Sequence, residues 1–144
     1  SFAFIWAAFD IFQDCLSLYI ASKGKYRKWN NIKQIGALLF MFGSLMETSH
    51  DIQRNYWISY PENKGKVYQY GWSRFIVYPN YCGYWLWNTG RGLITGNVIF
   101  AAATSIFHFY NFQSHSIARA HLFSLEKYGK EYEAYIAKTP KMIP

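Results

Sequence analysis

Two carboxylates stand inside an otherwise apolar stretch at the start of the chain. Asp10 and Asp14 are four residues apart, so on a helix they share one face. A carboxylate that faces lipid is costly, and we therefore expect this face to look at protein, a cavity or the membrane interface. Two interpretations stay open: a proton or cation site, or a helix tilted against partner proteins.

Histidine and cysteine side chains could bind a metal ion, but their spacing here does not support it. His108 and His115 have no third ligand at a suitable spacing. A lone histidine in an apolar helix more often makes one hydrogen bond to a neighbouring helix. Cys15 and Cys82 form neither a metal motif nor a disulfide framework, and we expect small buried side chains. We predict no metal or haem site.

The composition favours a membrane protein. Of the 144 residues, 22% are aromatic and only 16% are charged, far from an ordinary soluble surface. The net charge of +7 could indicate nucleic acid, but the Lys and Arg residues lie between apolar segments and do not form one basic face. Anionic lipid headgroups or acidic partner subunits fit this distribution better than nucleic acid does.

Runs of apolar residues predict an all-α, polytopic integral membrane protein that forms a single membrane domain over residues 1–144. Four runs predict apolar helices, and Arg91 and Gly92 are expected to bend the chain between the third and the fourth. A later segment is amphipathic, with apolar residues every three or four positions, and is expected to lie along the membrane surface. The five predicted helices cover residues 1–21, 34–50, 79–90, 93–112 and 118–137.

Glycines predict where two of these helices touch. Gly36 and Gly43 are seven residues apart and give one thin stripe that a neighbouring helix can approach. Pro79 suits the first turn of the third helix. Gly83, one turn later, also lets another backbone come close.

Two segments of the sequence resemble one known family. The first is the motif Pro79-Asn80-Tyr81-Cys82-Gly83, preceded by Gly71-Trp72, and the second runs from Tyr128 to Pro144. They are similar to the C-terminal domain of the steroid 5α-reductase family, and the resemblance extends over about residues 43–144. Members of this family are polytopic membrane proteins, and the characterised ones use NADPH to reduce a carbon–carbon double bond conjugated to a carbonyl.

The resemblance implies where a cofactor would bind. In the family, a Gly, an Asn four residues on, an Asp four later and an Arg soon after help to form the dinucleotide pocket. Gly43, Asp51 and Arg54 match this pattern, while Glu47 replaces the Asn. A carboxylate cannot donate a hydrogen bond and would repel phosphates. If the chain binds NADPH, the resemblance implies these cofactor-binding residues: Asp51, Arg54, Asn80 and Gly83.

Other positions of the family pattern are altered. The Arg-His before the proline is Val77-Tyr78, and the acidic residue after Gly83 is Tyr84. The Arg, His and Tyr expected on the last helix are replaced by Gln113, Ile117 and His121. Loss of one Arg–phosphate hydrogen bond alone costs about 1.5–3 kcal/mol. We therefore expect NADPH binding to be lost, and the space beside Asn80 and Asp51 to be closed by side chains or filled by lipid.

These changes predict a degenerate, non-catalytic subunit, packed with other membrane protein subunits and lipids in a larger complex such as a respiratory or other energy-converting one. No catalytic residue and no cofactor are expected, and the expected location is the mitochondrial inner membrane or the endoplasmic reticulum. The alternative is an NADPH-dependent reductase of an enone lipid or steroid. A weaker third resemblance is to isoprenylcysteine methyltransferases, where Ala120-His121 stands in place of a glutamate pair.

Overall fold

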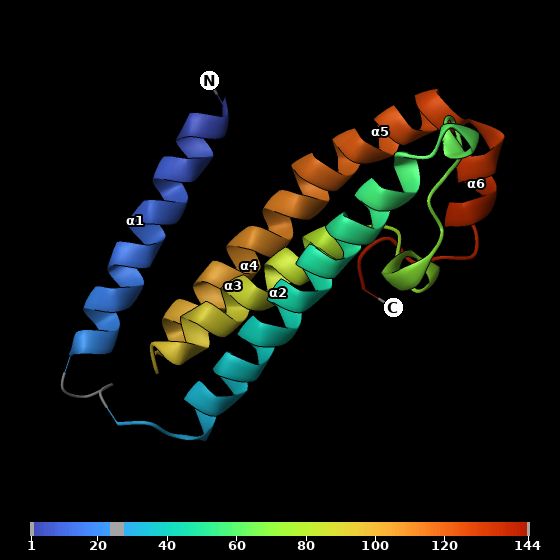
Figure 1. Ribbon diagram of the computed structural model, residues 1–144. Helices are drawn as coiled ribbons and strands as arrows, with labels where there is room; N and C mark the ends of the chain where they lie inside the picture. The colour runs from blue at the N-terminus through green and yellow to red at the C-terminus, as the bar shows by residue number, and fades with distance from the viewer. Residues whose placement is uncertain (1, 24–27, 144) are drawn as a thin grey trace.

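The computed structural model describes residues 2–23 and 28–143, and the all-α prediction is confirmed for these residues, which contain no strand. In Figure 1, α2 to α5 lie together, α1 stands to one side of them and α6 folds back at one end. Short turns at Pro61–Asn63 and Gly71–Arg74 interrupt the connection between α2 and α3. The helices are α1 (Phe2–Ser22), α2 (Asn31–Ile58), α3 (Pro79–Ile94), α4 (Val98–Asn111), α5 (Ile117–Tyr128) and α6 (Lys130–Ile136).

The closest helix contact joins α2 and α3 through two pairs of glycines. A Cβ atom built on Gly43 would lie 2.5 Å from the carbonyl oxygen of Gly83, and one on Gly90 would lie 2.5 Å from that of Gly36. Real Cβ atoms do not come this close to backbone atoms, so only glycine fits. The predicted stripe of Gly36 and Gly43 is therefore confirmed as a site of close approach, and its partner is α3.

Polar side chains attach α1 to α3 and α4. The Tyr84 hydroxyl donates to both carboxylate oxygens of Asp10, at 3.1 and 3.0 Å. The guanidinium of Arg91 pairs with the carboxylate of Asp14. Both aspartates thus bond to protein side chains, and the Asp14 side chain is at the same time 54% exposed. This agrees with the expectation that their face looks at protein or at a boundary.

Helices α2 and α3 are both longer than the sequence predicted. Helix α2 continues to Ile58 and so carries Asp51 and Arg54, because neither Gly nor Pro interrupts it before Pro61. The predicted bend at Arg91 and Gly92 is wrong, since α3 runs on to Ile94. The turn comes at Gly96, whose φ of 81° suits glycine.

The predicted amphipathic segment 118–137 is two helices and not one. Helix α5 follows α4 through a π turn at Phe112–Ser116, so the two helices run along nearly one line in Figure 1. Gly129, with a φ of 54°, then separates α5 from α6. The tail after α6 is held by hydrogen bonds from Val77 N to Pro140 O and from Tyr78 N to Lys141 O, both 2.9 Å.

Apolar side chains remain exposed on several helices, including Leu18, Leu45, Ile99 and Ile106, each at least 68% exposed. In the described part of the chain, however, each helix is either too short or too polar to cross a bilayer. The prediction that the four apolar runs form helices is therefore confirmed, but the prediction that these helices cross a membrane is not.

The glycine contact predicts whether a Gly→Ala substitution stabilises or destabilises the fold. Ala in place of Gly inside a helix normally stabilises by about 0.5–1 kcal/mol. We expect Gly43→Ala instead to destabilise by about 1–3 kcal/mol, because its methyl group meets the backbone of α3. Thermal unfolding of the purified protein, followed by helical circular dichroism, measures this. The exposed Thr48→Ala on the same helix is the control and should change little; a stabilised Gly43→Ala variant would contradict the account.

Candidate functional site

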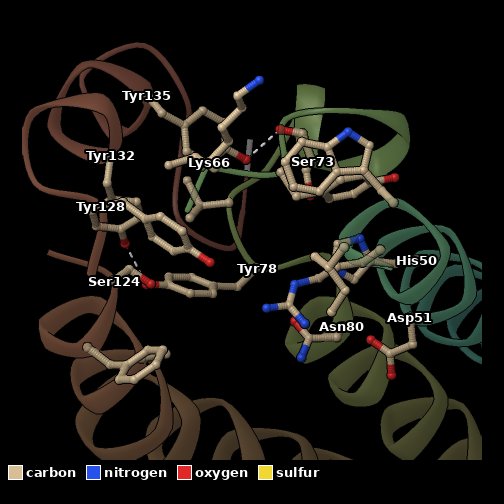
Figure 2. Close-up of a pocket in the computed structure, with 18 of the residues that line it drawn as sticks. His50, Asp51, Lys66, Ser73, Tyr78, Asn80, Ser124, Tyr128, Tyr132 and Tyr135 are labelled. Carbon is tan, nitrogen blue, oxygen red and sulfur yellow. Dashed lines mark hydrogen bonds between the residues drawn. The ribbon is translucent and has the colours of Figure 1, made fainter. Parts of the chain in front are cut away.

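A polar pocket lies at the end of the α2–α3 pair. It has a volume of about 250 Å³ and is lined from six parts of the chain: the end of α2, residues 66–68, residues 73–78, the start of α3, and helices α5 and α6. Figure 2 shows His50, Asp51 and Asn80 on one side of it and tyrosines and Ser124 on the other. The start of α3 is fixed by Pro79 in its first turn.

The rim of the pocket carries charge of both signs. Asp51 and Arg54 lie one turn apart on α2, and Lys66 comes from the following loop. All three side chains are exposed. The rim can therefore offer two cations to an anion and one carboxylate to a hydroxyl group.

His50 contributes a buried ring to the same pocket. It is 4% exposed, and its Nδ1 has no hydrogen-bond partner among the described residues. Burial lowers the pKa of His50 from its ordinary value to about 4, with a smaller opposing effect of Asp51. The ring is thus neutral at physiological pH, and its unpartnered Nδ1 is buried and not open to solvent.

The tyrosine that precedes α3, Tyr78, and the tyrosines of α6 form the opposite wall. The hydroxyl oxygens of Tyr78 and Tyr132 are 2.6 Å apart, and His121 Nδ1 lies 3.1 Å from the Tyr132 hydroxyl. Tyr135 donates to the backbone oxygen of Ser73. Burial raises the pKa of Tyr78, and raises that of Tyr135 to about 12. These hydroxyls therefore stay protonated and act as neutral hydrogen-bonding groups.

Three of the four predicted cofactor-binding residues meet in this pocket. Asp51, Arg54 and Asn80 all line it, although Asn80 follows Arg54 by 26 positions. Gly83 does not line it and lies instead against Gly43 and Glu47 of α2. Side chains do not close the space beside Asn80 and Asp51, because a cavity is present there. The other expectation, that lipid fills this space, stays a prediction.

Several residues that alter the family pattern lie outside the pocket, whereas Val77 and Tyr78, which stand in place of its Arg-His, line it. The Glu47 carboxylate accepts from Trp87 Nε1 at 2.7 Å and does not line the pocket. Tyr84 is bonded to Asp10. Ile117 is buried in the hydrophobic core, and Gln113 is exposed away from the lining. The substitutions at these positions therefore do not put a repulsive group inside the cavity.

Sequence reasoning missed Lys66 and the α6 tyrosines as pocket residues. The sequence predicts no role for Lys66, and it places Tyr132 and Tyr135 within the predicted surface helix 118–137. One signal for the tyrosines was available in the sequence. Apolar residues recur every three or four positions in this segment, and this spacing also places Tyr128, Tyr132 and Tyr135 on one helix face. Within residues 2–23 and 28–143, no three His, Cys, Asp or Glu side chains are arranged to hold a metal ion.

Fold and site together define an all-helical protein with a polar pocket at the end of a glycine-packed helix pair. The chain belongs to the family described as "Protein of unknown function (DUF1295)", whose model matches residues 1–139. This is a steroid 5α-reductase-like family. The sequence-based recognition is thus confirmed at the level of the family.

The chain is also similar to a protein named as a methyltransferase. The chain is 28% identical over 82 residues to a protein named "Probable O-methyltransferase ustE" from Ustilaginoidea virens. The match covers 57% of this chain and 29% of that protein, so the chain spans less than a third of the relative's length. No solved structure matches the chain significantly.

The buried His50 predicts how stability depends on pH. Its folded-state pKa of about 4 lies below the ordinary 6.5, so between these values only the unfolded state gains the proton. Stability should therefore fall as the pH drops from about 6.5 to 4, with His50 contributing up to about 1.4 kcal/mol per pH unit. Denaturant unfolding across this range should show a shallower fall for His50→Asn. The exposed His115→Asn is the control and should keep the original slope; equal slopes for His50→Asn and the unmodified protein would refute this role.

Proposed function

We propose that this chain forms the cofactor-binding part of a membrane-associated enzyme of the steroid 5α-reductase-like kind, and that the polar pocket binds NADPH. The observation that carries the proposal is the convergence of Asp51, Arg54 and Asn80 on one cavity of about 250 Å³. This volume is smaller than a typical ligand pocket of about 300–1,000 Å³, so part of the cofactor would extend beyond it.

The residues of the pocket fit a dinucleotide. Arg54 and Lys66 would hold phosphate groups by charge-assisted hydrogen bonds. The Asp51 carboxylate can accept from a hydroxyl of the nicotinamide ribose, which carries no 2′-phosphate in NADPH. The Asn80 amide, which also lines the pocket, would supply neutral hydrogen bonds.

NADPH, when bound, supplies a hydride for the reduction of a carbon–carbon double bond conjugated to a carbonyl, and an enone lipid or steroid is the proposed substrate class. The role of this chain is to bind and orient the cofactor, while tyrosines of α3 and α6 cover one side of the pocket from water. We assign no catalytic residue to this chain.

Membrane association is part of the proposal. Its support is the number of large apolar side chains left exposed, such as Leu18, Leu45, Ile99 and Ile106. The proposed location is the mitochondrial inner membrane or the endoplasmic reticulum, with lipids and other membrane subunits as neighbours.

Methyl transfer from S-adenosylmethionine is a second candidate, favoured by the relative named as an O-methyltransferase. The same Asp51 carboxylate would serve the ribose of that cofactor. A degenerate, non-catalytic subunit is a further candidate, and the observation in its favour is Ile117: it is buried where the family pattern places a polar residue.

Titration of the purified protein with NADPH and with S-adenosylmethionine, followed by thermal shift, tests these candidates. We expect saturable stabilisation by NADPH that Arg54→Gln weakens about tenfold or more, since a charge-assisted hydrogen bond contributes about 1.5–3 kcal/mol. Asn80→Ala should weaken it as well. The control is Lys28→Gln, before the start of α2, at the opposite end of that helix from Asp51 and Arg54.

Each outcome selects one candidate. Saturation by S-adenosylmethionine alone would favour methyl transfer, and saturation by neither cofactor would favour the non-catalytic subunit. An equal loss of NADPH affinity in Arg54→Gln and in Lys28→Gln would mean that NADPH binds outside this pocket.

A further inference from the structure

We infer that a second, wholly apolar cavity binds one acyl chain of an anionic phospholipid. The cavity has a volume of about 340 Å³ and lies on the other side of the segment 72–78 from the polar pocket. In this segment Ser73, Val77 and Tyr78 line the polar pocket, whereas Trp72, Phe75 and Ile76 line the apolar one.

The lining of this cavity suits a hydrocarbon chain. Two indoles form part of it, and the N–H of each is already bonded: Trp72 Nε1 donates to Ser49 Oγ at 2.9 Å, and Trp85 Nε1 donates to Ser105 Oγ at 3.0 Å. The remaining lining groups are aliphatic, aromatic or sulfur-containing, and include Met46, Ile76, Cys82 and Met142. Water would find few hydrogen-bond partners there, while a vacant cavity would forfeit dispersion contacts.

The mouth of the cavity is apolar and continues onto the exposed surface. Phe42, Phe75 and Ile143 line the cavity and are 49%, 65% and 49% exposed. An acyl chain could therefore enter directly from a lipid layer. The C-terminal tail forms one side of this mouth, where it passes beside α2 in Figure 1.

Two cations are sequence neighbours of residues that line the cavity, and their charge fits an anionic headgroup. Arg74 directly precedes Phe75, and Lys141 directly precedes Met142. Both side chains are exposed, and neither makes an ion pair with a carboxylate of the described residues. Their charge complements a lipid phosphate beside an apolar entry. This inference goes beyond the proposed function, and it holds whether or not the polar pocket binds a nucleotide.

The thiol of Cys82 is a reporter inside the cavity. The expectation of a buried side chain is wrong for Cys15, whose thiol is exposed on α1 and serves as a reference. The protein is purified in a sterol-based glycoside detergent without a flexible alkyl chain, as Cys15→Ser and as Cys82→Ser. The rate of alkylation by N-ethylmaleimide is then measured with and without dioleoyl phosphatidylglycerol. We expect alkylation of Cys82 to slow about tenfold at a lipid concentration ten times the dissociation constant, because protection scales with one plus that ratio.

The controls separate this site from a general effect of lipid. Alkylation of Cys15 should be unchanged, and dioleoyl phosphatidylcholine should protect Cys82 less than phosphatidylglycerol does. Changing Arg74 and Lys141 together to Gln should abolish that difference between the lipids. Unchanged alkylation of Cys82, or equal slowing of Cys15, would overturn the inference. If Cys82 never reacts, native mass spectrometry decides: one retained phospholipid supports the inference, and none overturns it.

Discussion

The backbone contact between α2 and α3 is the constraint on which the rest of the structure depends. Glycines on both helices remove the side chains that would hold them apart, so the two backbones touch at two levels, Gly43 with Gly83 and Gly36 with Gly90. This fixes the end of α2 beside the start of α3. Asp51 and Asn80 meet for that reason, and the function proposed for the pocket rests on the same contact.

The segment between α2 and α3 separates two chemically different cavities. Some side chains of residues 72–78 line the polar pocket and others line the apolar cavity. The tail is bonded to the backbone of Val77 and Tyr78. A polar cofactor and an apolar chain would therefore lie on opposite sides of one short stretch. This arrangement suits a protein at a lipid surface, where one ligand comes from water and the other from the membrane.

The helices, the glycine stripe and the meeting of Asp51, Arg54 and Asn80 were predictable, because each follows from local period or from the family pattern. The orientation of Glu47 was not predictable, because a side chain in the middle of a helix can point toward either of two neighbouring elements. Glu47 points toward α3, where it accepts a hydrogen bond from Trp87. The break at Gly129 and the pocket role of the α6 tyrosines depend on how the tail folds back, and no local pattern specifies that.

Photoaffinity labelling with an azido-adenine analogue of NADP tests the central claim, that the pocket at the end of the α2–α3 pair binds a nucleotide. After illumination and digestion, mass spectrometry locates the label along the chain. The account predicts label on peptides from residues 50–58 and 120–135, and its loss when excess NADPH is present. Label spread over other helices, or label that excess NADPH does not remove, would contradict it.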